Sequence, residues 1–174
     1  MERGSTKLET VTGDITAQSD LDAVVNAANA QLMPGGGVAG AIHRAAGREL
    51  IDACRPLAPI SPGEAVVTDG FGLPNRWIIH CLGPRYGIDE PSDALLTDCY
   101  RNALRLAERH GMRAIGFPAL STGAFGYPFE EAARVAVDAV DDTLETLQSP
   151  PELIRFVFFS DADRQAFDAV LNAV

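Results

Sequence analysis

The sequence has few cysteines, few basic residues and no long apolar run. Its three cysteines, Cys54, Cys81 and Cys99, are an odd number in a chain long enough to fold without disulfides, which is typical of a reducing compartment. No apolar run approaches the roughly 18 residues needed to span a bilayer, and the N-terminal residues MERGSTKLET lack the apolar core of a signal peptide. We therefore expect no disulfide, no membrane association and a cytoplasmic location.

Basic residues are outnumbered by acidic ones. Fourteen Lys and Arg residues against 24 Asp and Glu residues give a formal net charge of −10. A field of this sign repels nucleic-acid phosphates, so binding to the DNA or RNA backbone is not expected. An anionic ligand would have to be held by local backbone dipoles.

The length of 174 residues and the hydrophobic share of 47% predict a single globular domain over residues 1–174. Short β-rich runs alternate with longer stretches of helical period, which predicts an α/β fold with helices on both faces of a central sheet. The predicted strands are residues 8–11, 23–26, 65–68, 77–82, 114–120 and 154–159. The predicted helices are residues 38–54, 92–110, 129–147 and 161–173.

The first candidate ligand loop follows the strand that ends at Asn26. It contains Asn29 and three consecutive glycines before the next predicted helix. Ligands of α/β sheets bind beyond the carboxyl ends of the strands, so this loop is well placed. Gly35, Gly37 and Gly40 match G-x-G-x-x-G, but the first of them comes nine positions after the strand, which disfavours a dinucleotide fingerprint. A phosphate cradle at a helix N-terminus and a plain glycine-rich turn remain as interpretations.

The second candidate loop is STGAFGYP, residues 121–128, which follows the strand predicted to end at residue 120. Consecutive backbone amides with two glycines and two hydroxyls can form a concave nest for a pyrophosphate. Phe125 or Tyr127 is placed to cover a sugar. A serine nucleophile would need G-x-S-x-G, but Ala119 stands two residues before Ser121, so we interpret Ser121 as a hydrogen-bonding residue.

Two further residues have a functional and a structural interpretation. Asp14, after the first strand, either accepts a hydrogen bond from an exocyclic amine or serves as a turn or cap residue. His43, in the helix that follows the glycines, either lies near the ligand or is a packed or capping histidine. No pair of histidines or cysteines has zinc-ligand spacing, so we predict no metal site and no cofactor.

Taken together, five ordered segments resemble the macrodomain family, whose members bind ADP-ribose and in many cases hydrolyse its derivatives. The segments are VNAAN (25–29), GGGV (35–38), AIHRAAG (41–47), HCLGP (80–84) and STGAFGYP (121–128). The resemblance as a whole covers nearly the whole chain, and RAAG and GYP are most similar to the MacroD-type branch. The resemblance implies a three-layer α/β/α fold with a mixed central sheet of about six strands.

The resemblance also implies a set of ligand-binding residues: Asp14, Ile15, Asn26, Asn29, Gly36, Gly37, Val38, Ser121, Thr122, Gly123, Ala124, Phe125 and Phe159. Asp14 would hold the adenine amino group with help from the Ile15 amide, and Phe159 would stack on the adenine ring. Asn29 would bind the hydroxyls of the distal ribose, while Asn26 would brace the loop. Residues 36–38 would line that ribose and the phosphates, and residues 121–125 would cradle the diphosphate.

One position departs from the family pattern. The MacroD-type branch usually carries an aspartate where this chain has Ala39. Some viral and archaeal macrodomains also have alanine there and resemble active hydrolases, in which a water between a substrate phosphate and the ribose attacks the anomeric carbon. On this basis the expected catalytic residues are Asn29, Gly37 and Phe125, with His43 in reserve.

The resemblance implies a mono-ADP-ribosyl hydrolase that removes ADP-ribose from acidic side chains and deacetylates O-acetyl-ADP-ribose. The alternatives are a non-catalytic reader of ADP-ribose, which the alanine at position 39 favours, and a phosphatase acting on ADP-ribose 1″-phosphate. The expected partners are ADP-ribose, its derivatives and mono-ADP-ribosylated proteins. We expect the protein to be a monomer.

Overall fold

The apolar runs predicted as strands form one central sheet in the computed structural model, which describes residues 1–174. All six predicted strands are present, as β2 (Thr6–Thr12), β3 (Ala23–Ala27), β4 (Ala65–Asp69), β5 (Trp77–Cys81), β6 (Ala114–Phe117) and β7 (Leu153–Phe158). A seventh strand, β1 (Glu2–Arg3), pairs with β2, so the prediction of about six strands was one short. Two polar residues are too few to show a strand period.

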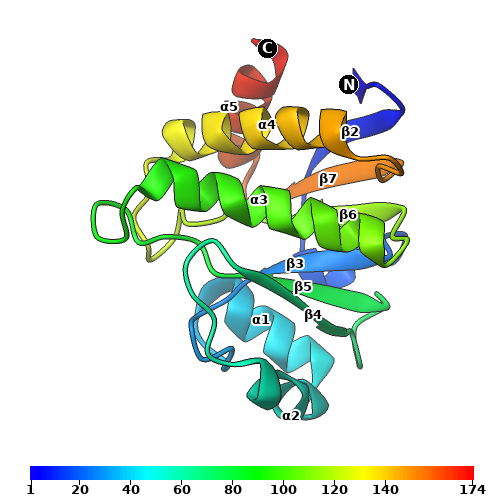
Figure 1. Cartoon of the computed structure of the whole chain (residues 1–174), viewed down its shortest axis with the longest axis vertical. Coiled ribbons are helices and arrows are strands. Elements are labelled where there is room, and N and C mark those ends of the chain that lie inside the picture. Colours follow the sequence, from blue (N-terminus) through cyan, green and yellow to red (C-terminus); the bar gives the residue numbers. More distant parts are fainter.

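The sheet is mixed, with strand order β1-β2-β7-β6-β3-β5-β4 (Figure 1). Strands β2, β7, β6, β3 and β5 run parallel to one another, whereas the edge strands β1 and β4 run antiparallel to their neighbours. The carboxyl ends of the five parallel strands therefore share one edge of the sheet. This is the edge at which open α/β sheets bind ligands.

Helices cover both faces of the sheet. The α-helices are α1 (Gly37–Ala46), α2 (Glu49–Cys54), α3 (Ser92–Arg109), α4 (Phe129–Thr146) and α5 (Asp161–Asn172), and two short 3-10 helices are η1 (Ile15–Ala17) and η2 (Arg55–Leu57). Apolar residues of α1 and α2 belong to one buried cluster, and those of α3, α4 and α5 belong to another. The three-layer α/β/α prediction is confirmed. None of the helices combines the length and apolar composition that crossing a membrane requires.

The predicted helix over residues 38–54 was wrong as a single element. Gly47 has a φ of 91°, and its N–H donates to the carbonyl oxygen of His43 at 3.0 Å, which ends α1. A second helix, α2, then begins at Glu49. The hydrophobic spacing continues through Leu50 and Cys54, which are both fully buried, so the sequence pattern alone did not show the break.

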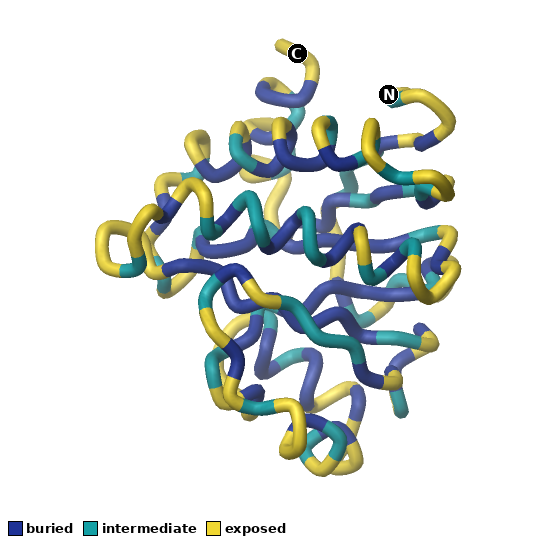
Figure 2. Tube along the Cα trace, in the orientation of Figure 1, coloured by how far each residue is buried: buried dark blue, intermediate teal, exposed yellow.

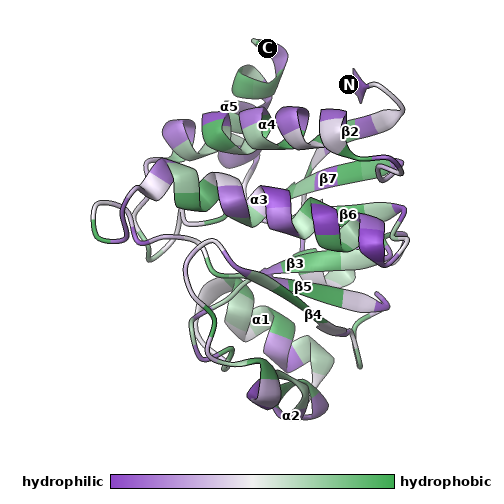
Figure 3. Cartoon of the chain, in the orientation of Figure 1, coloured by the Kyte–Doolittle hydropathy of each residue, from purple (hydrophilic) through white to green (hydrophobic).

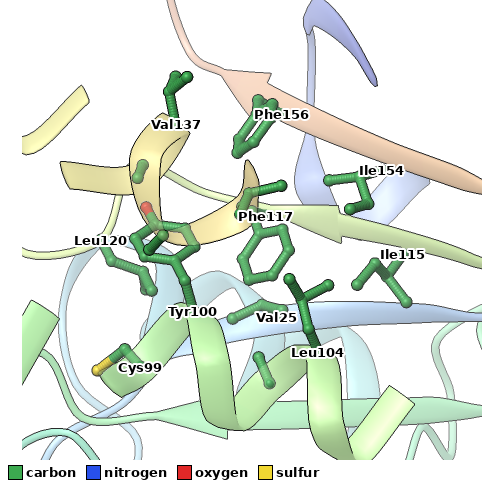
Figure 4. Packing of buried hydrophobic residues seen from close by; sticks show 14 of the residues in the cluster. Val25, Cys99, Tyr100, Leu104, Ile115, Phe117, Leu120, Val137, Ile154 and Phe156 are labelled. Carbon is green, nitrogen blue, oxygen red and sulfur yellow. The ribbon is translucent and has the colours of Figure 1, made fainter. Parts of the chain in front are cut away.

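The core lies on both sides of the sheet. Along β3, Val24 packs in the cluster beneath α1 and α2, while Ala23 and Val25 pack in the cluster beneath α3, α4 and α5. Figure 2 shows the central strands buried between exposed outer helix turns, and Figure 3 shows β3, β5 and β6 as largely apolar. In the larger cluster, the ring of Phe117 lies 5.1 Å from that of Tyr100 and 5.9 Å from that of Phe156 (Figure 4). A sheet buried on both faces rigidly supports the loops at its edge.

Candidate functional site

A cavity of about 500 Å³ opens where the parallel strands end. The loops after β2, β3, β6 and β7 and the N-terminus of α1 form its walls. The lining residues are Gly13, Ile15, Ala27, Ala28, Asn29, Gly35, Gly36, Gly37, Val38, Ala39, Pro118, Ala119, Ser121, Thr122, Gly123, Ala124, Phe125, Val157, Phe158, Phe159 and Asp163. The structure thus brings together all of the predicted ligand residues except Asp14 and Asn26.

The glycine loop presents the open N-terminus of α1 to this cavity. Gly37, the first residue of the helix, has a φ of 56°, a conformation that glycine adopts without strain. A Cβ on Gly40 would lie 2.3 Å from the carbonyl oxygen of Gly35, so only glycine lets the loop pack this closely against the helix. Gly36 at the N-cap supplies no side-chain hydrogen bond, and the N–H groups of residues 37–39 have no acceptor within the chain. These donors, at the positive end of the helix dipole, form an anion site.

The second loop presents another row of unpaired N–H groups. Ser121 adopts a φ of 66°, which is unusual for a residue with a side chain, and the N–H of Tyr127 donates to its carbonyl at 2.9 Å. The N–H of Gly126 donates to the carbonyl of Gly123 at 3.0 Å, closing a tight turn. Inside this turn the N–H groups of residues 123–125 have no acceptor in the chain. Loop 121–127 is therefore a nest of the predicted kind.

Asn29 also lines the cavity, in the segment that follows β3. Its amide donates to the carbonyl of Met33 at 2.8 Å and accepts from the N–H of Met33 at 3.0 Å. This pair of bonds shapes the loop that leads to the glycines. One N–H and one lone pair of the amide remain for a ligand, because each of its polar atoms uses only one partner.

Ile15 and Phe159 add apolar and aromatic surface to the cavity. Ile15 is buried, whereas the side chain of Phe159 is 70% exposed. Asp14 lies outside the cavity lining and caps η1, since its Oδ1 accepts from the N–H of Thr16 at 2.8 Å and from the Thr16 hydroxyl at 2.7 Å. These bonds hold the pKa of the Asp14 carboxyl below its usual range. The cap interpretation is confirmed, while Oδ2 has no partner in the chain, so the adenine contact stays a prediction.

Asn26 is not part of the cavity lining, so its assignment as a ligand-binding residue is corrected. It is 1% exposed, and its amide donates to Nδ1 of His80, 3.1 Å away on the neighbouring strand β5. His80 Nε2 lies 2.9 Å from the hydroxyl of Thr68 on β4. Burial, with a smaller contribution from the nearby His43 ring, lowers the pKa of His80 to about 3. The neutral imidazole ties three strands together, so Asn26 braces the sheet edge that carries the loop.

His43 is packed inside the protein. It is 6% exposed, neither ring nitrogen has a hydrogen-bond partner, and burial lowers the pKa of its ring. It does not line the cavity, although it follows Ala39 by one helical turn. The structure therefore supports His43 as a packed histidine and not as a residue near the ligand.

The cavity contains no basic side chain, and Asp163 is its one ionisable residue. Ala39 lines the wall at the third position of α1 and offers no carboxylate. Sequence reasoning missed Asp163 because an acidic residue in the first turn of a helix has a sufficient local explanation in the helix dipole. An anion in this cavity would therefore bind to neutral donors, mainly the backbone N–H groups, rather than to a cationic side chain.

Comparison with known proteins agrees with this geometry. The family model described as "Macro domain" matches residues 25–136. A macro domain-containing protein of Chlorobaculum tepidum is 44% identical over 167 residues, covering 95% of this chain and 96% of that protein. An O-acetyl-ADP-ribose deacetylase of Enterobacter sp. is 44% identical over 170 residues, covering 95% of this chain and 93% of that protein.

Solved structures of macrodomains are also similar to this chain. The Oceanobacillus iheyensis macrodomain with ADP has a TM-score of 0.94 and 39% identity, covering 99% of this chain and 94% of that one. The Trypanosoma brucei macrodomain in complex with ADP-ribose has a TM-score of 0.86 and 36% identity, covering 93% of this chain and 68% of that one. By sequence, fold and the two loops that line its cavity, the chain belongs to the macro domain family.

Proposed function

We propose that the cavity binds ADP-ribose, with the adenine at the Phe159 end and the distal ribose at the Asn29 end. The observation that carries this proposal is the convergence of two rows of unpaired N–H groups, at residues 37–39 and 123–125, on one cavity. A diphosphate between the rows would satisfy donors that the chain leaves open. Similarity to macrodomains solved with ADP and with ADP-ribose supports this ligand class.

We further propose that the chain hydrolyses ADP-ribose derivatives. Its reactions would be the removal of ADP-ribose from acidic side chains of mono-ADP-ribosylated proteins and the deacetylation of O-acetyl-ADP-ribose. Relatives named O-acetyl-ADP-ribose deacetylase, at 43% and 44% identity, support the hydrolase class. The proposed form is a monomer acting in the cytoplasm.

In the proposed cleavage, water attacks the anomeric carbon of the distal ribose. The bond from that carbon to the ester oxygen breaks, and the target carboxylate leaves. Because Ala39 provides no base at this end of the cavity, a phosphate oxygen of the substrate accepts the proton of the water. Asn29 positions the ribose, while Gly37 and Phe125 confine the phosphate and the water, so catalysis rests on orientation and preorganised dipoles.

A non-catalytic reader is the second candidate, and Ala39 is the observation that favours it. A reader needs the two N–H rows and the Phe159 platform but no attacking water. The two candidates therefore share a binding site and differ only in turnover.

The experiment that separates them follows free ADP-ribose released from a protein mono-ADP-ribosylated on glutamate or aspartate. Asn29→Ala should lower kcat by more than the loss of binding explains, because the ribose is no longer oriented. The matched control is Asn102→Ala, since the Asn102 amide donates to the carbonyl of Gly63 at 2.8 Å and lies outside the cavity. Binding of ADP-ribose by wild type without any release would support the reader instead.

A further inference from the structure

Asp163 is a solvent-exposed carboxylate that lines a cavity suited to an anion, and its side chain has no partner in the chain. It lies in the first turn of α5, where its backbone N–H donates to the Ser160 hydroxyl at 3.1 Å. Its side chain makes no hydrogen bond and no ion pair. The nearest basic residue along the helix, Arg164, pairs with Asp168 at 3.7 Å. No cationic side chain pairs with Asp163, so within the chain only the N-terminal dipole of α5 compensates its charge.

A carboxylate without a cationic partner is unfavourable beside a phosphate and favourable beside hydroxyl groups. In a nucleoside diphosphate, the ribose lies between the base and the phosphates, and its two hydroxyl groups can donate hydrogen bonds. The exposed ring of Phe159, four residues before Asp163, offers the stacking surface for a base. With the base on Phe159 and the phosphates at the N–H rows, the ribose next to the base is the group that suits Asp163.

Resting on the proposed function, we propose that Asp163 recognises the free 2′-hydroxyl of the base-linked ribose and excludes ligands that carry a 2′-phosphate. The same end of the cavity holds no cation to receive such a phosphate. Asp14, which caps η1 between the lining residues Gly13 and Ile15, adds a second carboxylate near this end. A third phosphate would therefore meet negative charge alone. Carboxylates select unphosphorylated ribose in dinucleotide-binding folds for the same reason.

The test is calorimetric titration of the full chain with ADP-ribose and with ADP-ribose 2′-phosphate. Wild type should bind the 2′-phosphate at least about tenfold more weakly, because like charges oppose each other across the contact. Asp163→Asn should bind ADP-ribose several-fold more weakly and reduce the discrimination to about threefold or less. Asp161→Asn, which removes the same charge from the same helix turn outside the cavity, should leave the discrimination unchanged.

The outcomes distinguish this inference from the function on which it rests. Equal affinity of folded wild type for both ligands would overturn the role of Asp163 and leave ADP-ribose binding intact. An equal loss of discrimination in Asp161→Asn would also overturn the role of Asp163, because the effect would then come from the total negative charge at this helix turn and not from a contact with the ligand. Absence of ADP-ribose binding would refute the proposed function itself. Thermal unfolding of each variant checks that the fold is retained.

Discussion

The N-terminus of α1 differs from those of the other four α-helices. Helices α2, α3, α4 and α5 each carry an acidic residue in the first turn, and the Ser160 hydroxyl caps α5. Helix α1 has no acidic residue in its first turn and no side-chain cap. Four helices thus compensate their own dipoles, whereas α1 leaves its positive end open toward the cavity. The anion site of α1 therefore depends on the absence of an acidic first-turn residue and of a side-chain cap, which are groups that stabilise helices elsewhere in the chain.

The largest effect should come from closing the α1 site sterically. Gly37→Val places a β-branched residue at a φ of 56° and puts bulk against the unpaired N–H groups, so ADP-ribose affinity should fall by about a hundredfold or more. Calorimetric titration measures the loss. Gly111→Val is the matched control, because Gly111 has a φ of 68° beyond the end of α3. It should lower stability and leave affinity intact. Unimpaired binding by a folded Gly37→Val protein would show that the loop is not a phosphate cradle.

A second prediction concerns Asp14, a carboxylate that caps a short helix beside the cavity. Asp14→Ala should weaken ADP-ribose binding by about 1–3 kcal/mol if Oδ2 also holds the adenine amine, because a charge-assisted hydrogen bond is lost. Titration with ADP-ribose measures this change. Thr16→Val removes the hydroxyl partner of the cap and keeps the carboxylate, so it controls for the cap. An unchanged affinity in Asp14→Ala would leave Asp14 with its structural role alone.

A third prediction concerns a variant in which α1, like the other α-helices, carries a carboxylate near its N-terminus. A Cβ on Gly36 meets nothing within 4 Å, so Gly36→Asp should cap the helix without strain and raise the free energy of unfolding by about 0.3–1 kcal/mol. The same carboxylate should lower ADP-ribose affinity about tenfold, because it occupies the open N–H groups of α1 and repels the phosphates of the ligand. Urea unfolding and calorimetry measure the two effects. Gly36→Asn supplies a neutral cap, and equal losses in both variants would rule out charge as the cause.

The smallest expected effect is that of salt. Because no basic side chain lines the cavity, binding releases few counterions, and screening of the net charge of −10 slightly favours an anionic ligand. Raising the salt from about 50 to about 300 mM should change ADP-ribose affinity by less than about threefold. A steep loss of affinity would mean that arginine side chains, rather than backbone N–H groups, hold the diphosphate.

The fold and most of the cavity could be predicted because their signals are local. Continuous apolar runs show strands buried on both faces, and glycines before a helix show where N–H groups are left open. The break at Gly47 was missed because hydrophobic spacing continues through α2. The bracing role expected for Asn26 agrees with the structure, but its inclusion among the ligand-binding residues was wrong because its partner His80 is 54 residues away in sequence.

Asp163 was missed for a related reason. Its position in a helix first turn is a local fact, but its place in the cavity depends on how α5 packs against β2 and β7. Contacts between distant segments decide whether a polar residue faces a ligand or the core. Such contacts leave no periodic signal in a single sequence.

The central claim is that the open N–H groups of α1 and of loop 121–127 hold the diphosphate. The most direct measurement is the chemical shift of the backbone amides during titration of ¹⁵N-labelled protein with ADP-ribose. We expect large changes in chemical shift at Gly37, Val38, Gly123, Ala124 and Phe125, and small ones at the first turns of α3 and α4. Saturable binding that leaves those five amides unchanged would contradict it.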